Sequence, residues 1–326
     1  MNKFIFTCGD INGIGPELVI KALNKIAIRT KDKFIFICPQ NVFDHTSKIV
    51  KPKFDFAVTN SNELKFDSTV TILNYGSFKQ KIGSPTKDSG RASFLAIKKS
   101  FELTINKIGD AIITSPISKN AINMAGEKFP GHTEMYAEWC GVKNFVMMFL
   151  SKKMNAALAT IHEPLKNVPH IITKNSITQK LEVIIAALKN DLRISLPRIA
   201  ILGLNPHAGE NGLIGLEEKE IIIPVISESK LSKYLSGPFS PDAFFANQMY
   251  KKFNLVLGMY HDQVLIPFKM INFGEGVNYT AGLPIVRTSP DHGTAFDIAG
   301  RGIANESSLI KSFLYAKKIV SNRTHK

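Results

Sequence analysis

Four histidines stand directly after runs of apolar residues, each in a short polar segment typical of a turn. They are His162 in TIHEP, His207 in NPHAGE, His261 in MYHDQ and His292 in SPDHGTAFDIAGRG. In an open α/β sheet ligands gather where strands end, so this placement indicates a functional edge. Three imidazoles can hold a divalent metal with positions left open for substrate, which activates a hydroxyl or carbonyl group. The histidines are far apart along the chain, so spacing alone leaves open that they are ordinary surface residues.

Two glycine-containing segments also suit an anionic ligand. Residues 9–17 (GDINGIGPE) predict a strand-to-helix turn whose backbone N–H groups face a phosphate, or else a tight turn that lets helix and sheet approach closely. The segment matches neither the dinucleotide fingerprint nor the P-loop. In residues 129–141, His132 and Thr133 follow Pro-Gly at the start of a short helix, where donors suit an anion. The alternative is that Thr133 only caps that helix.

Strands and helices alternate through most of the chain and would position these segments. Apolar runs predict strands at residues 4–8, 34–38, 70–73, 111–114, 198–204 and 255–258. Helical patterns begin at the Pro16 turn and, with Ser89 as the expected cap, at residue 89, and recur at 176–188, 217–227, 242–252 and 305–320. Such alternation favours an α/β fold with mainly parallel strands, and no linker marks a domain boundary.

Composition limits the class of protein further. With 326 residues the chain is expected to form two domains. Its apolar runs are too short for a membrane span, its N-terminus reads as a strand and not a secretory signal, and its three cysteines have the spacing of free thiols in a reducing cytoplasm. The net charge of +14 raises the alternative of a nucleic-acid-binding protein. Because the lysines are scattered over expected helix faces, we expect no nucleic-acid site and only steering of anionic ligands.

Six segments together resemble the 4-hydroxythreonine-4-phosphate dehydrogenase family. They are GDINGIGPE, SPISKNAI, FPGHTEMYAE, GLNPHAGENGLIGLEE, YHDQVLIPFK and GLPIVRTSPDHGTAFDIAGRG. They occur in the family's order and extend from Gly9 to Gly302. The last also resembles the adenosine-binding loop of isopropylmalate and isocitrate dehydrogenases.

This resemblance implies a two-domain fold like that of isopropylmalate dehydrogenase, with mainly parallel sheets and an active-site cleft between the domains. Residues 1–125 and 285–326 would form the first domain, with the nucleotide-binding loop. Residues 126–284 would form the second, with the metal ligands and the interface of a homodimer. The resemblance implies an active site shared between subunits, with His162 and His207 from one chain and His261 from the other.

The resemblance also assigns roles to individual residues. The implied metal ligands are His162, His207 and His261. The implied substrate-binding residues are His132, Thr133, Lys269, Asn278 and Arg287. The implied nucleotide-binding residues are His292, Gly293, Thr294, Ala295, Asp297 and Gly300. Asp242 falls on a carboxylate near the substrate, and either Asp242 or Lys269 would serve as the general base.

The implied reaction is the oxidation of a small phosphorylated hydroxy amino acid by NAD or NADP with a divalent metal (zinc, magnesium or cobalt). 4-Phosphooxy-L-threonine would become 2-amino-3-oxo-4-phosphooxybutanoate, which loses CO₂ to give 3-amino-2-oxopropyl phosphate, in vitamin B6 synthesis. The chain departs from the family pattern at Ile11, at Glu163 and at Ala243, which replaces a hydroxyl residue beside Asp242. The alternatives are a dehydrogenase of a phosphorylated threonate or erythronate, and a phosphate acyltransferase of related fold. The DHGTAFDIAG loop speaks against the acyltransferase.

Overall fold

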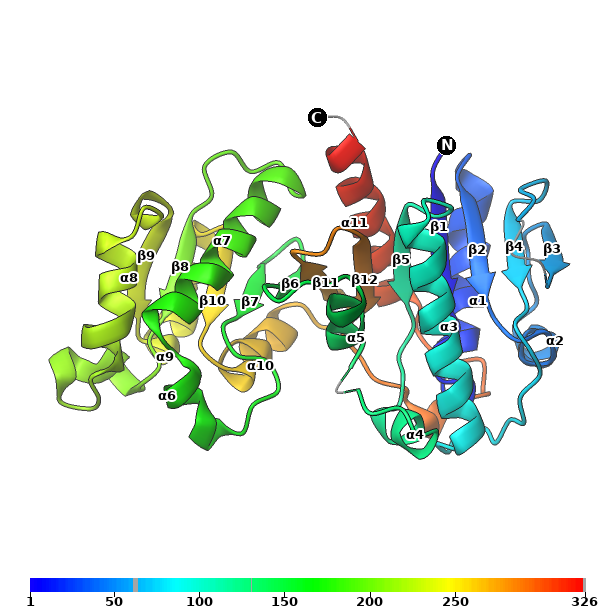
Figure 1. Cartoon of the computed structure of the whole chain (residues 1–326), viewed down its shortest axis with the longest axis horizontal. Helices are drawn as coiled ribbons and strands as arrows, with labels where there is room; N and C mark the ends of the chain where they lie inside the picture. The colour runs from blue at the N-terminus through cyan, green and yellow to red at the C-terminus, as the bar shows by residue number, and fades with distance from the viewer. Residues whose placement is uncertain (61–63, 130, 325–326) are drawn as a thin grey trace. The chain divides into compact units, whose positions relative to one another are not determined.

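The computed structural model describes residues 1–60, 64–129 and 131–324 and divides into two compact units (Figure 1). Unit 1 comprises Met1–Gly141 and Leu283–Val320, and unit 2 comprises Val142–Gly282 and Ser321–Lys326. The sequence-based division was drawn at residues 125/126 and 284/285. Each unit is described by itself below.

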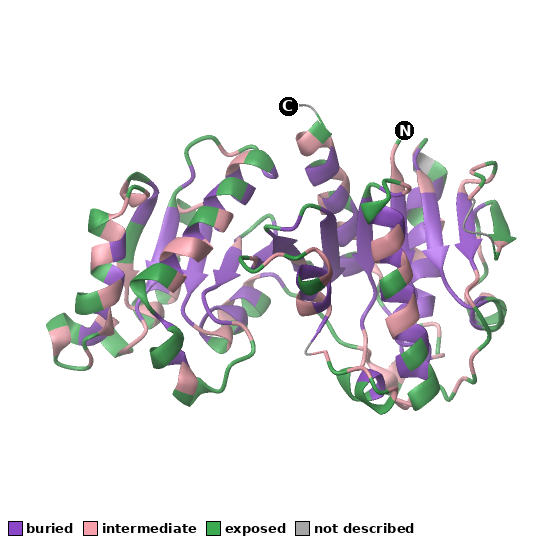
Figure 2. Ribbon diagram, viewed as in Figure 1, coloured by how far each residue is buried: buried purple, intermediate pink, exposed green. Residues whose placement is uncertain are grey.

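Unit 1 is built on a parallel sheet. Its strands, in spatial order, are β3 (Phe56–Thr59), β4 (Val70–Leu73), β2 (Lys33–Ile37), β1 (Lys3–Thr7), β5 (Ala111–Thr114) and β12 (Val286–Pro290). The central strands are apolar and buried along nearly their whole length, as expected for a parallel sheet covered on both faces (Figure 2). Because these strands are parallel, the segments after β1, β5 and β12 meet at one edge of the sheet.

The helices of unit 1 follow its strands. They are α1 (Gly15–Ile26), α2 (Gln40–Ile49), α3 (Lys87–Ile105), α4 (Lys119–Met124), α5 (His132–Trp139) and α11 (Ser307–Thr324), with short turns η1 (Ala27–Arg29) and η7 (Phe296–Ile298). The cap of α3 is Thr86, not Ser89 as predicted: Thr86 Oγ1 accepts from the Ser89 N–H while Ser89 Oγ accepts from the Thr86 N–H. Ser89 completes a reciprocal capping box from the third helical position.

Helix α5 belongs to unit 1 because it packs on α3. The hydroxyl groups of Tyr136 and Ser100 are 2.7 Å apart, and the Trp139 ring lies 6.0 Å from Phe94 and 5.5 Å from Phe101. These aromatic contacts place the end of the first unit's leading segment after Gly141. His132 and Thr133 therefore lie in the same unit as Arg287.

Unit 2 contains a mixed sheet. In spatial order its strands are β11 (Val277–Ala281), β6 (Val146–Leu150), β7 (Ala156–Leu158), β10 (Leu255–Gly258), β8 (Ile199–Leu202) and β9 (Leu235–Phe239). Strand β6 is antiparallel to both its neighbours, whereas β7, β10, β8 and β9 are parallel to one another. The segments after β7, β10 and β8, which carry His162, His261 and His207, therefore leave one edge of the sheet side by side.

The helical elements of unit 2 are short apart from α7 and α10. They are η2 (Leu165–Asn167), α6 (Val168–Ile171), α7 (Lys174–Asn190), η3 (Pro206–Gly212), η4 (Glu218–Ile222), α8 (Ile223–Glu228), η5 (Ser232–Tyr234), α9 (Pro241–Ala246), η6 (Met249–Lys252) and α10 (His261–Ile271). The helix predicted at 217–227 is a π-helical turn followed by α8, and the one predicted at 242–252 is α9 followed by η6.

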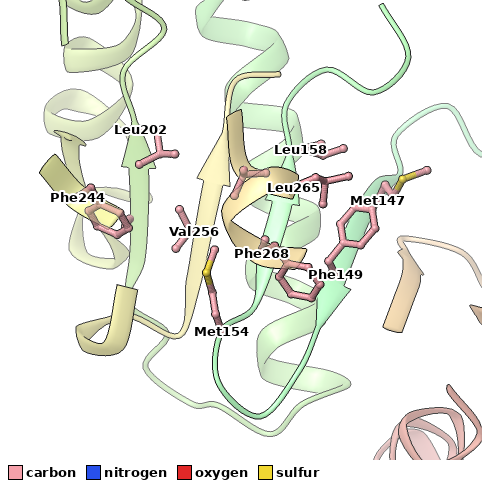
Figure 3. Close-up of a cluster of buried hydrophobic side chains, with 12 residues drawn as sticks. Met147, Phe149, Met154, Leu158, Leu202, Phe244, Val256, Leu265 and Phe268 are labelled. Atoms are coloured by element: carbon pink, nitrogen blue, oxygen red, sulfur yellow. The ribbon is translucent and has the colours of Figure 1, made fainter. Parts of the chain in front are cut away.

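A cluster of buried apolar side chains fixes α10 against the sheet of unit 2 (Figure 3). Phe268 and Leu265 on α10 meet Phe149 on β6 and Val256 on β10, and the Phe149 and Phe268 rings are 5.7 Å apart. Each such side chain contributes about 1.5–3 kcal/mol through burial, so α10 is held firmly. His261, its first residue, is thereby fixed at the sheet edge.

In the part of the chain that the structure describes, no helix combines the length and apolar character needed to cross a membrane.

Candidate active site

The segments carrying His162 and His261 are tied together backbone to backbone. The Ala159 N–H donates to the carbonyl of Gly258 at 2.9 Å, and the Thr160 N–H donates to that of Met259 at 3.2 Å. Thr160 Oγ1 donates to the same Met259 carbonyl at 2.7 Å. As a result the His162 and His261 rings of one chain lie with their centroids 5.9 Å apart.

This pair suits a shared divalent cation. Two imidazoles on one tetrahedral zinc, with Zn–N distances of about 2.0–2.1 Å, have ring centroids roughly 5 Å apart. His261 Nδ1 lies 2.6 Å from Asp262 Oδ1, and such a carboxylate contact orients a ligand histidine and leaves Nε2 for the metal. These donors are therefore of the kind that binds zinc, cobalt and other divalent transition metals. The resemblance implied that His261 acts in the partner's site, which stays a prediction; within one chain His261 lies beside His162.

His207 lies in an unusual backbone segment. His207, Ala208, Glu210 and Asn211 have φ values of +51°, +52°, +41° and +56°, and Gly209 lies between them at +76°. A non-glycine residue in this left-handed region costs about 1–2 kcal/mol, so surrounding contacts must hold the segment. Its side chain is exposed, and among the described residues no group of three His, Cys, Asp or Glu side chains is arranged to hold a metal. The structure thus joins His162 to His261 and does not add His207 to them.

A pocket of about 220 Å³ lies beside His207. Its lining includes Asn205, His207, Asp242, Tyr260 and Gln263. Gln263 is buried and bridges two histidine-bearing segments: its Oε1 accepts from the Met259 N–H at 2.7 Å, and its Nε2 donates to the Gly203 carbonyl at 2.6 Å. The ends of β8 and β10 are thereby held together at the mouth of this pocket.

The predicted catalytic residues lie on the same unit. Ser240 Oγ donates to Asp242 Oδ1 at 2.5 Å, and this bond, with the Ala243 N–H and the nearby His207, lowers the pKa of Asp242. Asp242 is exposed and ionised at neutral pH, which makes it a weak base. Lys269 is exposed on α10. Asn278, on β11, has a buried Oδ1 with no hydrogen-bond partner among the described residues.

In unit 1, Arg287 is a buried cation that contacts two threonine hydroxyl groups. Its side chain is only 2% exposed, and it donates through Nη2 to Thr114 Oγ1 at 2.6 Å and through Nη1 to Thr133 Oγ1 at 3.5 Å. Burial lowers the pKa of Arg287 to about 10, so the guanidinium remains charged at neutral pH. Thr133 is in the first turn of α5, where the helix dipole also favours an anion.

His132 lies beside this guanidinium. Burial, together with the positive charges of Arg287 and Lys119, lowers the pKa of His132 well below 6.5. The ring is therefore neutral at pH 7, and its buried Nε2 has no hydrogen-bond partner among the described residues. Lys119, at the start of α4, approaches the same turn: a Cβ added to Gly131 would lie 3.7 Å from its Cε. The arrangement fits a phosphate or carboxylate.

The predicted nucleotide-binding loop packs on the glycine-rich turn of unit 1. The Ile14 N–H donates to the Thr294 carbonyl at 3.0 Å, and a Cβ on Gly13 would lie 2.8 Å from that oxygen. Gly15 approaches Cys8 more closely still: a Cβ added to Gly15 would lie 2.1 Å from the Cys8 carbonyl oxygen. These contacts favour the close-packing interpretation of residues 9–17. Ala295, at φ +42°, turns the loop into η7, which contains Asp297.

One buried carboxylate in this region was not singled out by the sequence. Asp10 accepts from the Asn12 N–H at 2.9 Å and from Ser89 Oγ at 3.2 Å, and burial raises the pKa of Asp10 to about 6. The sequence offered one indication of this carboxylate: Asp10 directly follows Gly9 at the end of an apolar strand. Asp10 braces the turn on which the predicted nucleotide-binding loop packs.

Comparisons with known proteins agree with the resemblance seen in the sequence. The family model described as "Pyridoxal phosphate biosynthetic protein PdxA" matches residues 30–316. A 4-hydroxythreonine-4-phosphate dehydrogenase from Sulfurihydrogenibium sp. is 40% identical over 313 residues, which cover 96% of each chain. One from Bacteroides thetaiotaomicron is 38% identical, covering 97% of this chain and 88% of its own.

Solved structures extend this agreement to the fold. The 4-hydroxythreonine-4-phosphate dehydrogenase of Klebsiella pneumoniae superposes with a TM-score of 0.83 at 31% identity, covering 98% of this chain and 100% of that one. An isocitrate dehydrogenase from Methylococcus capsulatus, at 13% identity and a TM-score of 0.51 over 99% and 87% of the two chains, shares the fold alone. The α/β fold class related to isocitrate and isopropylmalate dehydrogenases is confirmed. From the extent of these matches, the chain belongs to the PdxA family of pyridoxal phosphate biosynthetic proteins.

Proposed function

We propose that this chain is a 4-hydroxythreonine-4-phosphate dehydrogenase that uses NAD or NADP and a divalent metal. The observation that carries the proposal is the presence of two donor sets, one in each unit, in a member of this family. Unit 2 holds two imidazoles 5.9 Å apart, and unit 1 holds a buried guanidinium beside Thr133 and a neutral His132. The first set suits a metal that activates a hydroxyl, and the second suits the phosphate of the substrate.

In this proposal Arg287, Thr133 and the first turn of α5 bind the substrate's phosphate or carboxylate. His132 donates a hydrogen bond to it as a neutral imidazole, and Asn278 and Lys269 contribute further polar contacts. The loop that contains His292, Gly293, Thr294, Ala295, Asp297 and Gly300 binds the nucleotide, braced by the turn at residues 9–17. Contacts of this kind orient a bound substrate's C3 hydroxyl for oxidation.

When bound near His162 and His261, a divalent metal would supply a Lewis acid that lowers the pKa of the substrate's hydroxyl, and NAD or NADP held by the loop at residues 292–300 would supply the hydride acceptor. A base takes the hydroxyl proton while hydride leaves C3, so 4-phosphooxy-L-threonine and NAD⁺ give the 3-oxo acid, NADH and a proton. The 3-oxo acid then loses CO₂ and becomes 3-amino-2-oxopropyl phosphate. Asp242, which the hydrogen bond from Ser240 keeps ionised, and Lys269 are the two candidates for this base.

The active unit in this proposal is a homodimer whose metal site takes ligands from both chains. His207 stands apart from the His162–His261 pair, so we assign it to the partner's pair. Large apolar side chains are exposed on unit 2: Leu213 is 84% exposed in the segment after His207, and Met270 and Phe273 are 78% and 93% exposed at the far end of α10 from His261. Exposed apolar side chains of this size are typical of a surface that another protein chain covers. Free buried thiols at Cys8 and Cys38 support a cytoplasmic enzyme.

A substrate panel tests the proposed reaction. Formation of NADH or NADPH would be measured with 4-phosphooxy-L-threonine, 4-hydroxythreonine, and phosphorylated threonate and erythronate. We expect the highest kcat/KM for 4-phosphooxy-L-threonine and a fall of roughly 10–100-fold without the phosphate, because charge-assisted hydrogen bonds of about 1.5–3 kcal/mol are lost. A preference for phosphorylated threonate or erythronate would mean a related dehydrogenase. The loss of a hydroxyl residue at Ala243, beside Asp242, is the departure from the family pattern that bears on this alternative. Acyl phosphate formation without NAD would mean an acyltransferase.

A further inference from the structure

Glu218 is a buried carboxylate in unit 2 for which the proposed reaction has no use. It is 2% exposed and begins η4, a π-helical turn of the kind that is rare and frequently found at functional sites. A buried carboxylate is costly unless hydrogen bonds satisfy it. Its partners therefore indicate what it is buried for.

The Glu218 carboxylate contacts the segment that carries His207. The Asn205 backbone N–H donates to Glu218 Oε1 at 2.7 Å, and the Asn205 side-chain amide donates to Glu218 Oε2 at 2.9 Å. On the other side of His207, a Cβ added to Gly209 would lie only 2.5 Å from Glu218 Oε2. The carboxylate thus touches the chain two residues before and two residues after the histidine.

This contact falls where the backbone most needs support. Residues 207–211 form the left-handed run, and an ordinary loop would relax out of it. The Asn205 amide also donates to Glu217 Oε2 at 2.8 Å, so a second glutamate holds the residue before this run in place. Gly209 has no side chain, so the carboxylate can reach this turn.

We propose that Glu218 is a positioning residue for the metal site: it holds the left-handed turn that presents His207. The proposal rests on the proposed role of His207 as a metal ligand and deepens it. Residues that orient metal ligands typically change metal affinity by 10–100-fold when removed. Glu218 is the residue of this kind for His207, as Asp262 is for His261.

Titration of metal-free protein with Co²⁺ tests this assignment, with the cobalt absorption band as a report on coordination geometry. Glu218→Gln keeps the shape and one acceptor but turns an amide toward that of Asn205. We expect its Kd for Co²⁺ to rise about 10–100-fold, with a changed band. The matched control is Glu220→Gln, an exposed glutamate on the same turn, which should stay within about twofold of wild type. Affinity for NAD, bound by unit 1, should be unchanged in both.

The outcomes separate this inference from the proposed function. Wild-type protein that binds no Co²⁺ would overturn the metal chemistry and the positioning role with it. Wild-type protein that binds Co²⁺, with folded Glu218→Gln matching its Kd and its band, would overturn the positioning role alone. If Glu218→Gln does not fold, Asn205→Ala breaks the same link from the half-exposed side. A folded Asn205→Ala protein with wild-type Co²⁺ affinity would then count against the proposal.

Discussion

Arg287 carries its charge in a buried position where few residues would tolerate one. Its guanidinium reaches Thr114 from β5 and Thr133 from α5, so three parts of unit 1 converge on one cation. Desolvation lowers its pKa to about 10, which leaves it positive at neutral pH. A buried cation surrounded by hydroxyls attracts a phosphate or carboxylate more strongly than an exposed lysine does, because water screens it less.

Replacing Arg287 should therefore weaken substrate binding selectively. We expect Arg287→Ala to raise KM for the phosphorylated substrate by roughly 10–100-fold, from the loss of about 1.5–3 kcal/mol in charge-assisted hydrogen bonds, with little change in KM for NAD. Arg287→Lys should restore only part of the loss, since an ammonium lacks the planar two-point contact. Arg91→Ala, an exposed arginine on α3, is the control. Equal effects on both ligands would make Arg287 structural.

His132 makes the stability of the protein depend on pH. Because the folded pKa lies below the unfolded value of about 6.5, the unfolded chain binds the proton first as pH falls. Stability from this group is complete above pH 6.5 and is lost below it, by at most about 1.4 kcal/mol per pH unit. Chemical denaturation at pH 5 and pH 7.5 should show a smaller difference for His132→Gln than for wild type. An unchanged difference would contradict the assignment.

At the scale of elements, the strands were the most predictable part. The runs at 4–8, 34–38, 70–73, 111–114, 198–204 and 255–258 are confirmed to within two residues at each end. They are buried parallel strands, whose continuous apolar character is readable locally. Helix α10 was missed because it begins at His261, in what reads as a turn, and contains Pro267.

The site was less predictable because its geometry depends on strand order. The local sequence does not reveal that β10 lies between β7 and β8 in the sheet. This strand order brings the His162 and His261 segments together. Glu218 fell within the helix predicted at residues 217–227, and a sequence pattern does not reveal that a carboxylate turns inward. The pairing of Arg287 with Thr133 joins residues far apart in the chain, and only the family resemblance suggested it.

Gln263 links the ends of β8 and β10, and its removal should affect both stability and the metal site. Gln263→Leu leaves the Met259 N–H and the Gly203 carbonyl buried without their partner. At about 1–3 kcal/mol for each of these two groups, urea unfolding should show a loss of roughly 2–6 kcal/mol. Gln179→Leu, on the half-exposed face of α7, should change stability by less than about 0.5 kcal/mol. A similarly small loss for Gln263→Leu would show that the bridge is dispensable.

At the scale of the whole molecule, the proposed dimer has consequences for how defects combine. In the arrangement we propose, His162 and His261 of one chain meet His207 of the partner. His207→Ala and His261→Ala homodimers should each be nearly inactive. Refolded together, about half the dimers are mixed, and each mixed dimer has one intact site, so about a quarter of wild-type activity should return.

A second mixture distinguishes the two ways of sharing ligands. His162→Ala refolded with His261→Ala should recover nothing, because both residues serve the same site from the same chain. If His261 instead joined the partner's His162 and His207, as the family resemblance implied, this mixture would also recover about a quarter. Wild-type protein taken through the same refolding sets the scale. Mixed dimers that form yet remain inactive in both mixtures would exclude a shared site.

Metal dependence is the most direct test of the account as a whole. NADH formation from 4-phosphooxy-L-threonine would be followed after exhaustive chelation, with metal content measured by elemental analysis and folding by circular dichroism. Because the histidines lie at strand ends and not in the core, we predict a folded, inactive protein whose turnover returns with Zn²⁺, Co²⁺ or Mg²⁺. Full activity in protein shown to be free of metal would contradict the account.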